Sequence, residues 1–309
     1  MRTAIRSCAA ALAILSVAGT ARAAKLKSIG VSVSDLGNPF FVRIGEAVEA
    51  KAKELGGAGV KVTIVSSAYD LQRQIGQVDG FIEKKVDLII LTAADPIGIE
   101  PAVRRAQKAG IRVLAVDVNA KGADATVTTD NTQAGEIACA YLAKLLNGKG
   151  NVVIINGPPV SAVADRVKGC RRALAQHPDL VLLSDVQNGG GNRDGGLEKM
   201  TDLLTAFPRI DGVFAINDPT AMGAELAARQ AHRGFVITGV DGAPSIEERL
   251  KDGASLIEGS SAQFPDEMAG RAVEIGVALL NGRRPVKDTI LIPAVLVTKG
   301  NVKRYRGWE

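Results

Sequence analysis

Short apolar runs alternate with longer segments of helical periodicity along most of this chain. Residues 29–33, 86–91 and 111–116 are mainly apolar, with one polar residue in each range, and the segments between them carry apolar side chains three or four positions apart. Continuous apolar strands are typical of parallel sheets whose two faces are covered by helices. The alternation therefore predicts βαβ units with right-handed crossovers.

The same alternation begins again in the second half of the chain. Strands are expected at 29–33, 60–65, 86–91, 111–116 and 126–128, and then at 151–155, 181–186, 212–216, 235–240 and 256–261. The tail at 289–298 also alternates like a strand. Two successive blocks of this kind predict an α/β protein with two doubly wound, parallel-sheet lobes.

Hydrogen-bonding side chains follow nearly every expected strand, and open α/β sheets bind ligands at these carboxyl ends. The residues are Asn38, Ser67, Asp95, Asp117, Asn156, Asn217 and Asp241. Helix starts also need polar caps, and Asn38-Pro39, Asp95-Pro96 and Asp218-Pro219 each fit an N-cap followed by a proline. Roughly half of these residues are therefore expected to be caps alone. Asp117 is different because a loop follows it.

Two adjacent aromatic residues, Phe40 and Phe41, lie at the start of the first expected helix. Aromatic residues make up only 4% of the chain, so such a pair beside a strand-to-helix turn is unusual. Core packing of both rings, with Asn38 as a simple cap, explains this stretch as well as a ligand site does. The recurrence of polar strand ends favours the ligand site.

Residues 1–23 differ from the rest of the chain. Two arginines precede an apolar run at 9–18, and Ala-Arg-Ala at 21–23 fits a small-residue cleavage site. The run is much shorter than the roughly 20 apolar residues that span a membrane. The segment therefore predicts a secretory signal peptide that is cleaved near Ala23-Ala24.

Removing this segment changes the charge of the protein. The whole chain has 38 basic and 33 acidic residues and a formal net charge of +5. Three arginines and no acid lie in residues 1–23, so 35 bases remain against 33 acids, and the net charge falls to +2. No run rich in Lys and Arg is present, and we expect no nucleic-acid partner.

Two cysteines, Cys139 and Cys170, follow the signal segment. An exported chain permits a disulfide, but each residue lies in an expected helix, and the sequence does not show whether their Cα atoms approach. Two buried free thiols are at least as consistent with the pattern. The chain has only two histidines, no Cys/His cluster has metal-ligand spacing, and we expect no metal site.

Catalytic motifs are absent from the sequence. It contains no Gly-x-Ser-x-Gly elbow and no phosphate loop, and the glycine-rich stretch at 189–196 lacks dinucleotide-binding spacing. Asp117 and Asp241 could form a carboxylate pair, but no proton donor or metal accompanies them. Together with Asn, Gln and Arg side chains they suit the recognition of hydroxyl groups. We therefore expect a binding protein without a cofactor rather than an enzyme.

These features together resemble the periplasmic sugar-binding proteins of ABC transporters, in the ribose-binding-protein-like (type I) group. The resemblance covers essentially the whole chain after the signal segment. It rests on Asn38-Pro39-Phe40-Phe41, Asp117, Arg166 to Gly169, Asn217-Asp218, Val240-Asp241-Gly242 and Ala262-Gln263. It implies a periplasmic monomer whose two lobes close on a sugar or polyol and deliver it to a separate membrane permease. Service to a chemoreceptor is compatible with it.

The resemblance also implies which residues bind the ligand and where the lobes divide. The implied ligand-binding residues are Asn38, Phe40, Phe41, Asp117, Arg166, Asn217, Asp241 and Gln263. The lobes would comprise residues 24–129 plus 264–292 and residues 130–263 plus 293–309. Three crossings of the chain between the lobes would form the hinge.

Two positions depart from the ribose-type pattern. Val118 stands where that pattern has an arginine directly after the aspartate, and Gly191 stands where it has an aromatic residue of the second lobe. Tyr69, at the next strand end, is a possible substitute for the missing ring. Fewer donors and more room predict a different sugar, a deoxy sugar or a polyol, rather than ribose.

A second class of protein shares the two-lobe fold that the resemblance implies. This is the effector-binding core of LacI-type transcription repressors. Such a repressor would begin with a DNA-binding helix-turn-helix, whereas this sequence begins with the expected signal peptide. We therefore favour the transport protein.

Overall fold

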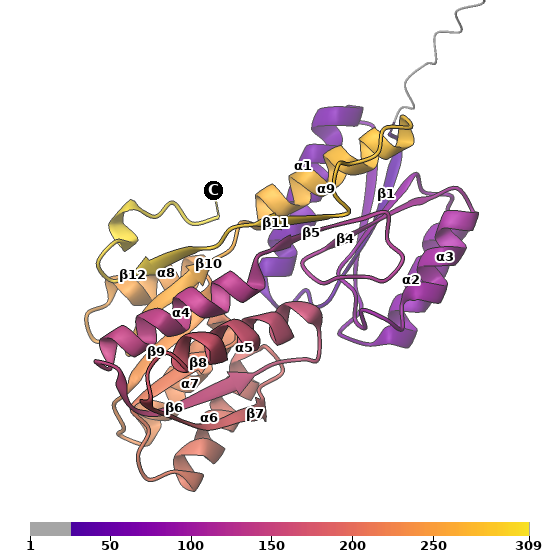
Figure 1. The fold of residues 1–309 in the computed structure, drawn as a ribbon. Coiled ribbons are helices and arrows are strands. Elements are labelled where there is room, and N and C mark those ends of the chain that lie inside the picture. The colour runs from indigo at the N-terminus through magenta and orange to yellow at the C-terminus, as the bar shows by residue number, and fades with distance from the viewer. Residues whose placement is uncertain (1–25, 309) are drawn as a thin grey trace, which may run out of the picture.

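A computed structural model describes residues 26–308 of the chain (Figure 1). The expected signal peptide lies outside the described residues. Two α/β lobes lie side by side, and each is built on one six-stranded sheet. No helix in residues 26–308 has the length and apolar character needed to cross a bilayer.

The first lobe is built on a parallel sheet. Its strands, in spatial order, are β11 (Thr289–Ile292), β5 (Ala125–Thr129), β4 (Arg112–Val116), β3 (Leu88–Leu91), β1 (Ser28–Val33) and β2 (Lys61–Ser66). Its helices are α1 (Pro39–Gly56), α2 (Leu71–Glu83), α3 (Glu100–Lys108) and α9 (Pro265–Leu280).

The central strand β3 shows why this lobe has apolar side chains on both faces of its sheet. Leu88 and Ile90 pack with α1 and α9, whereas Ile89 and Leu91 pack with α2 and α3. Side chains alternate between the faces of a strand, so a strand covered on both sides must be apolar throughout. The continuous apolar runs in the sequence reflect this burial.

The second lobe repeats the strand order of the first. Its strands, in spatial order, are β12 (Val295–Thr298), β10 (Ile257–Ala262), β9 (Val236–Asp241), β8 (Gly212–Ala215), β6 (Lys149–Asn156) and β7 (Asp179–Asn188). Helices α4 (Asn131–Leu145) and α5 (Ser161–Leu174) cover one face. Helices α6 (Arg193–Ala206), α7 (Asp218–Gln230) and α8 (Pro244–Lys251) cover the other. Strand β12 runs antiparallel to β10.

The predicted fold class is confirmed, with two doubly wound lobes joined by three crossings. The chain leaves the first sheet after β5, returns to that lobe after β10, and leaves it again between β11 and β12. The expected strand at 289–298 therefore divides at Pro293, which cannot donate a ladder hydrogen bond. The lobe boundaries drawn from the sequence stay a proposal. Trp308, placed by them in the second lobe, packs in the core of the first.

Two of the three predicted N-caps were wrong. Asn38 does cap α1, and its Oδ1 accepts from the backbone N of Phe40 at 3.0 Å. Asp95 instead closes a separate turn, because the chain bends once more before α3 begins. Asn217, rather than Asp218, caps α7, since the proline occupies the second helical position there. Asp218 is buried and accepts from the Ser260 hydroxyl at 2.6 Å.

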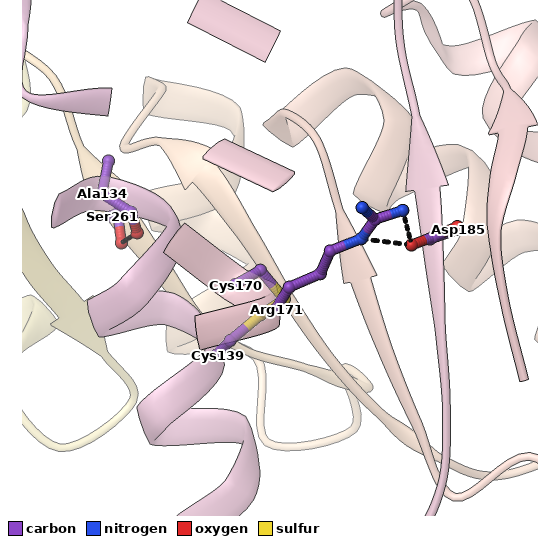
Figure 2. The surroundings of a disulfide bond; sticks show 6 residues. All are labelled: Ala134, Cys139, Cys170, Arg171, Asp185 and Ser261. Carbon is purple, nitrogen blue, oxygen red and sulfur yellow. Dashed lines mark hydrogen bonds and ion pairs between the residues drawn. A yellow bond between two sulfur atoms is a disulfide. The ribbon is translucent and has the colours of Figure 1, made fainter. Parts of the chain in front are cut away.

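Helices α4 and α5 are joined by a disulfide between Cys139 and Cys170 (Figure 2), a question that the sequence left open. Their Cα atoms lie 5.0 Å apart, within the usual range for a disulfide. The two helices approach closely nearby, because a Cβ atom on Gly135 would lie 2.0 Å from the carbonyl oxygen of Arg166. Glycine is required at this crossing, and the disulfide fixes the same pair of helices.

Candidate functional site

A cavity of about 40 Å³ lies between the lobes, where the strands of both sheets reach their carboxyl ends. All eight predicted ligand-binding residues line it, and so do the three possible ones. In chain order, these residues are Asn38, Phe40, Phe41, Tyr69, Asp117, Val118, Arg166, Gly191, Asn217, Asp241 and Gln263. Each of the eight is at most 9% exposed. The lining is therefore almost completely buried in this arrangement of the two lobes.

The first lobe contributes an aromatic wall. The rings of Phe40 and Phe41 meet edge to face, with centroids 5.3 Å apart, and Tyr69 meets Phe41 at 6.4 Å in the same way. Asn38 fixes the start of α1 and so directs these rings toward the cavity. Its amide nitrogen remains as a donor, because only its oxygen is used by the cap. Such a wall can cover the C–H face of a sugar ring.

Asp117 follows β4 in a left-handed backbone conformation, with φ 66°. The hydroxyl of Thr128 donates to the carbonyl oxygen of Asp117 at 2.6 Å and holds this turn. The Oδ1 atom of Asp117 is buried and has no hydrogen-bond partner among residues 26–308. Burial raises the pKa of the carboxyl to about 6, against the opposing charge of Arg166. A buried acceptor without a donor is costly, and a ligand hydroxyl would satisfy it.

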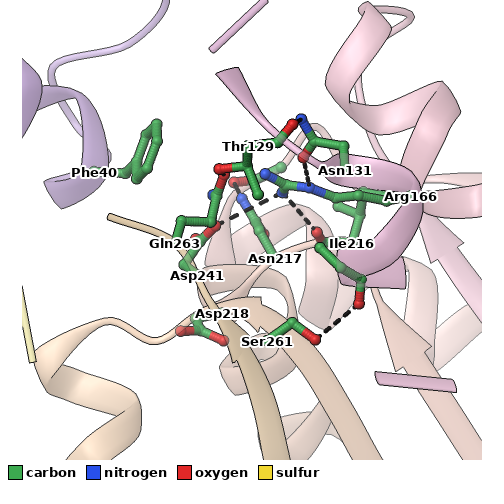
Figure 3. A network of polar contacts seen from close by, with 12 residues as sticks. Phe40, Thr129, Asn131, Arg166, Ile216, Asn217, Asp218, Asp241, Ser261 and Gln263 are labelled. Atoms are coloured by element: carbon green, nitrogen blue, oxygen red, sulfur yellow. Dashed lines mark hydrogen bonds and ion pairs between the residues drawn. The ribbon is translucent and has the colours of Figure 1, made fainter. Parts of the chain in front are cut away.

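Arg166 extends from α5 into the second-lobe side of the cavity (Figure 3). Its Nε donates to Asn131 Oδ1 at 2.8 Å, and its Nη1 donates to the carbonyl oxygen of Ile216 at 3.0 Å. Nη1 also lies 3.7 Å from Asp241 Oδ1. These contacts fix the plane of the guanidinium and leave the Nη2 group without a hydrogen bond to any residue of the described chain. Arg166 therefore supplies an oriented donor that is still free.

Asp241 ends β9 and belongs to the same network. Gln263 Nε2 donates to Asp241 Oδ1 at 2.8 Å, and Gln263 Oε1 accepts from the hydroxyl of Thr129 at 2.8 Å. Thr129 and Gln263 lie at two of the chain crossings, so the hinge and the site share hydrogen bonds. Burial raises the pKa of Asp241 to about 6, while the charge of Arg166 opposes this rise. Phe40 faces this network from the other lobe (Figure 3).

Asn217 has a partly structural role. Its Oδ1 caps α7, and its Nδ2 donates to the carbonyl oxygen of Gly191 at 2.8 Å. It therefore holds the glycine turn against the cavity. Asn217 lines the cavity, and its direct contact with a ligand stays a prediction.

Gly191 has φ 68°, and a Cβ atom there would lie 3.9 Å from the hydroxyl oxygen of Tyr69 and 3.5 Å from Pro158 Cδ. Tyr69 thus reaches across from the first lobe toward the position where the ribose-type pattern has a ring. Burial raises the pKa of Tyr69 further above its usual range, so its hydroxyl stays neutral and can donate. Val118 is buried and contributes an apolar surface to the cavity.

Sequence reasoning missed three residues that support this site, namely Thr129, Asn131 and Trp308. Asn131 begins α4 and in the sequence resembles any other polar residue at a helix start. Thr129 ends β5 and has no distinguishing feature in the sequence. Trp308 is the only tryptophan of the chain, which was a signal in itself. Conversely, Ser67, Asp95 and Asn156 are polar strand ends that do not line the cavity. Within residues 26–308, no group of three or more His, Cys, Asp or Glu side chains could hold a metal.

The two carboxyl groups that line the cavity predict opposite effects of pH on stability and on binding. Their pKa of about 6 exceeds the value of about 3.9 for an unfolded aspartate. Between these values the folded state holds protons that the unfolded state lacks. Asp117 and Asp241 therefore add stability to the unliganded protein as pH falls from about 6 to about 4, and this contribution is lost as pH rises through 6.

Ligand binding should show the reverse trend, because an ionised carboxylate accepts hydroxyl donors more strongly than a protonated one. We expect affinity to fall as pH decreases through about 6, as measured by calorimetry. Asp117→Asn should reduce the dependence of both properties on pH, and asparagine tolerates the left-handed backbone at this position. An affinity that is constant from about pH 7.5 to about pH 5 would contradict the assignment of these groups.

Comparison with known proteins places the chain among solute-binding proteins. The periplasmic binding protein domain family matches residues 29–284. The ribose import binding protein RbsB of Bacillus subtilis is 32% identical over 275 residues, which cover 88% of this chain and 87% of that protein. A xylitol-binding protein of Mycolicibacterium smegmatis is 33% identical over 290 residues, covering 92% and 80% of the two chains.

Solved structures give the same result. An ABC transporter solute-binding protein from Actinobacillus succinogenes, crystallised with D-allose, matches with a TM-score of 0.82 and 29% identity. The match covers 90% of this chain and 100% of that chain. The two-lobe α/β fold described above is therefore shared with a solute-binding protein that was crystallised with a sugar.

Proposed function

This chain belongs to the periplasmic binding proteins, in their ribose-binding-like type I group, and from that premise we propose that it delivers one sugar or polyol to the permease of an ABC transporter. Proteins of this group bind solutes and do not catalyse reactions, so the protein is not an enzyme. Relatives named for ribose, xylitol and D-apiose support a ligand with several hydroxyl groups.

The buried, unpartnered oxygen of Asp117 is the observation that carries this proposal. Asp117 lines a cavity that is also lined by the aromatic wall of Phe40 and Phe41 and by Arg166. An apolar face opposite charged and amide groups matches a sugar, whose C–H and hydroxyl faces differ. Hydroxyl groups that are removed from water need such partners, because an unpaired polar group is expensive to bury.

The capture step follows from the enclosure of the site. Both lobes supply lining residues, and a ligand that contacts both binds the closed form more tightly than the open one. Its differential affinity then shifts the protein toward closure, and the three crossings absorb the motion as hinges. The Thr129–Gln263 hydrogen bond joins two of these crossings.

The proposal also covers the export of the protein, its location in the cell and its partners. We propose that residues 1–23 direct export and are removed, and that the protein acts in the periplasm as a monomer. The closed form would be the one that the permease binds. Service to a chemoreceptor is compatible with the same site.

We propose that the preferred ligand is a deoxy sugar, a polyol or another sugar rather than ribose itself. The argument rests on Val118, which offers no donor beside Asp117, and on Gly191, which offers no ring. The hydroxyl of Tyr69 partly occupies the approach to Gly191 and adds a donor of its own. Without an arginine at position 118, ribose should bind about 2–3 kcal/mol more weakly than it would with that contact.

A thermal-shift screen tests both levels of the proposal. Pentoses, hexoses, deoxy sugars and alditols are added singly, and a bound ligand raises the melting temperature by mass action. We expect one sugar or alditol to give a clear shift that Asp117→Asn largely removes. If ribose gave the largest shift, the ligand assignment would be wrong. If no compound shifted the wild type, the transport function itself would be contradicted.

A further inference from the structure

The last residues of the described chain run from the second lobe to the first. The short 3₁₀ helix η1 (Val302–Arg304) is anchored by Val302, which is buried in the core of the second lobe. Tyr305 follows, and its hydroxyl donates to the carbonyl oxygen of Gly242 at 2.7 Å. This tail is therefore fixed to the second lobe before it reaches Trp308.

Trp308 is attached to both lobes. Its ring packs edge to face against Phe40 of the first lobe, with centroids 5.9 Å apart, and it is only 8% exposed. Its carbonyl oxygen accepts from Arg43 Nη2 at 2.9 Å, again in the first lobe. Its indole Nε1 donates to the carbonyl oxygen of Asp241 at 3.0 Å, in the second lobe. Phe40 and Asp241 both line the cavity.

The second-lobe contact falls on a strained piece of backbone. Asp241 has φ 137° and Gly242 has φ 68°, values that are rare for a residue with a side chain. Such conformations persist only where surrounding contacts determine them. Here the tail donates to both consecutive carbonyl groups, from Trp308 to Asp241 and from Tyr305 to Gly242. The orientation of the Asp241 side chain depends on this backbone.

We propose that Trp308 is a positioning residue for ligand binding, which holds Asp241 and Phe40 in place on opposite sides of the closed cavity. Trp308 does not itself line the cavity. It acts on the ligand through the carbonyl group of Asp241 and through the ring of Phe40. The inference rests on the proposed function, since it assigns these two residues to the ligand. It predicts that the tail contributes to affinity and to closure together.

The first test needs no ligand. Trp308 is the only tryptophan in the sequence, so intrinsic fluorescence reports on this residue alone. Phe40→Leu removes the aromatic contact of Trp308 with the first lobe, and Tyr305→Phe removes the neighbouring second-lobe hydrogen bond. We expect each variant to increase quenching of Trp308 by acrylamide. Phe235→Leu changes a buried ring of the second-lobe core away from the cavity and should leave quenching unchanged. Equal quenching in all four proteins would overturn the bridging role.

The second test uses xylitol as the probe in calorimetry. Trp308→Phe keeps an aromatic ring but loses the pyrrole part of the indole with its N–H donor, so xylitol should bind about fivefold more weakly. Trp308→Leu also loses the edge-to-face contact, and the loss should reach about thirtyfold. Phe235→Leu is the control for a general loss of stability and should bind like the wild type.

The outcomes separate the inference from the proposed function. Wild-type affinity in Trp308→Phe and Trp308→Leu would overturn the positioning role and leave the transport function intact. Failure of xylitol and of every other sugar or alditol to bind the wild type would contradict the proposed function. In that case increased quenching in Phe40→Leu and Tyr305→Phe would still support the bridge, and unchanged quenching would overturn it.

Discussion

Arg166→Met is expected to weaken ligand binding by about 2–4 kcal/mol, measured by calorimetry with the compound that gives the largest thermal shift. Methionine keeps much of the side-chain length and removes the charge. Asn131 Oδ1 and the Ile216 carbonyl then lose their donor, and Asp241 loses its nearby cation. The pKa values of Asp117 and Asp241 should rise further, since the Arg166 charge now lowers both.

A matched control lies on the same helix. Arg172 is exposed and is 3.7 Å from Glu136, so Arg172→Met removes an equal charge from α5 without touching the cavity. Its affinity should equal that of the wild type. Removing one partner of a buried charge pair also destabilises the fold, by about 3–5 kcal/mol. Asp241→Asn is therefore a second variant, which keeps the shape of the side chain. Native affinity in both binding-site variants would show that the network is structural only.

Loss of the Cys139–Cys170 disulfide should lower the free energy of unfolding by about 3–4 kcal/mol, because a cross-link over 31 residues restricts the unfolded chain. The double variant Cys139→Ala/Cys170→Ala tests this in urea unfolding. Alanine avoids placing new hydroxyl groups between two buried helices. The affinity for the ligand should change little, since the close crossing at Gly135 still holds Arg166 near Asn131.

Reduction of the wild type supplies the control for this experiment. With a strong reductant present, its unfolding midpoint should move toward that of the double variant, while the variant itself should not respond. Identical midpoints for the oxidised and reduced wild type would show that the two cysteines remain thiols. A large loss of affinity in the double variant would show that the disulfide, and not the glycine crossing, positions Arg166.

The fold was predictable because burial on both faces of a sheet produces a simple pattern of apolar residues in the sequence. A strand such as β3 is apolar throughout, and the helices between strands have one apolar face. The helix starts were less predictable. Asp95-Pro96 and Asp218-Pro219 look like Asn38-Pro39, but a cap depends on where the backbone turns, and neighbouring residues shift that point by one or several positions.

The residues that line the cavity were predicted more fully than the residues that hold them in place. Asp117 could be singled out because a loop follows it, and Arg166 because of the resemblance to a known family. Asn131, Thr129 and Trp308 act through contacts with residues far away in sequence, and a single sequence does not show which residues those partners are. The disulfide was undecidable for the same reason. Cys139 and Cys170 occupy different helices, and the sequence does not show that these two helices pack closely together.

The three crossings also determine the order in which this chain can fold as it is made. Helix α9 packs against α1 in the core of the first lobe, and Ile292 and Trp308 belong to that core as well. Residues 28–129 therefore cannot complete their core until residues 265–308 exist, after the whole intervening second-lobe segment has been synthesised. Contacts over such long sequence separations form slowly. The first lobe to be translated is thus among the last parts of the molecule to become stable.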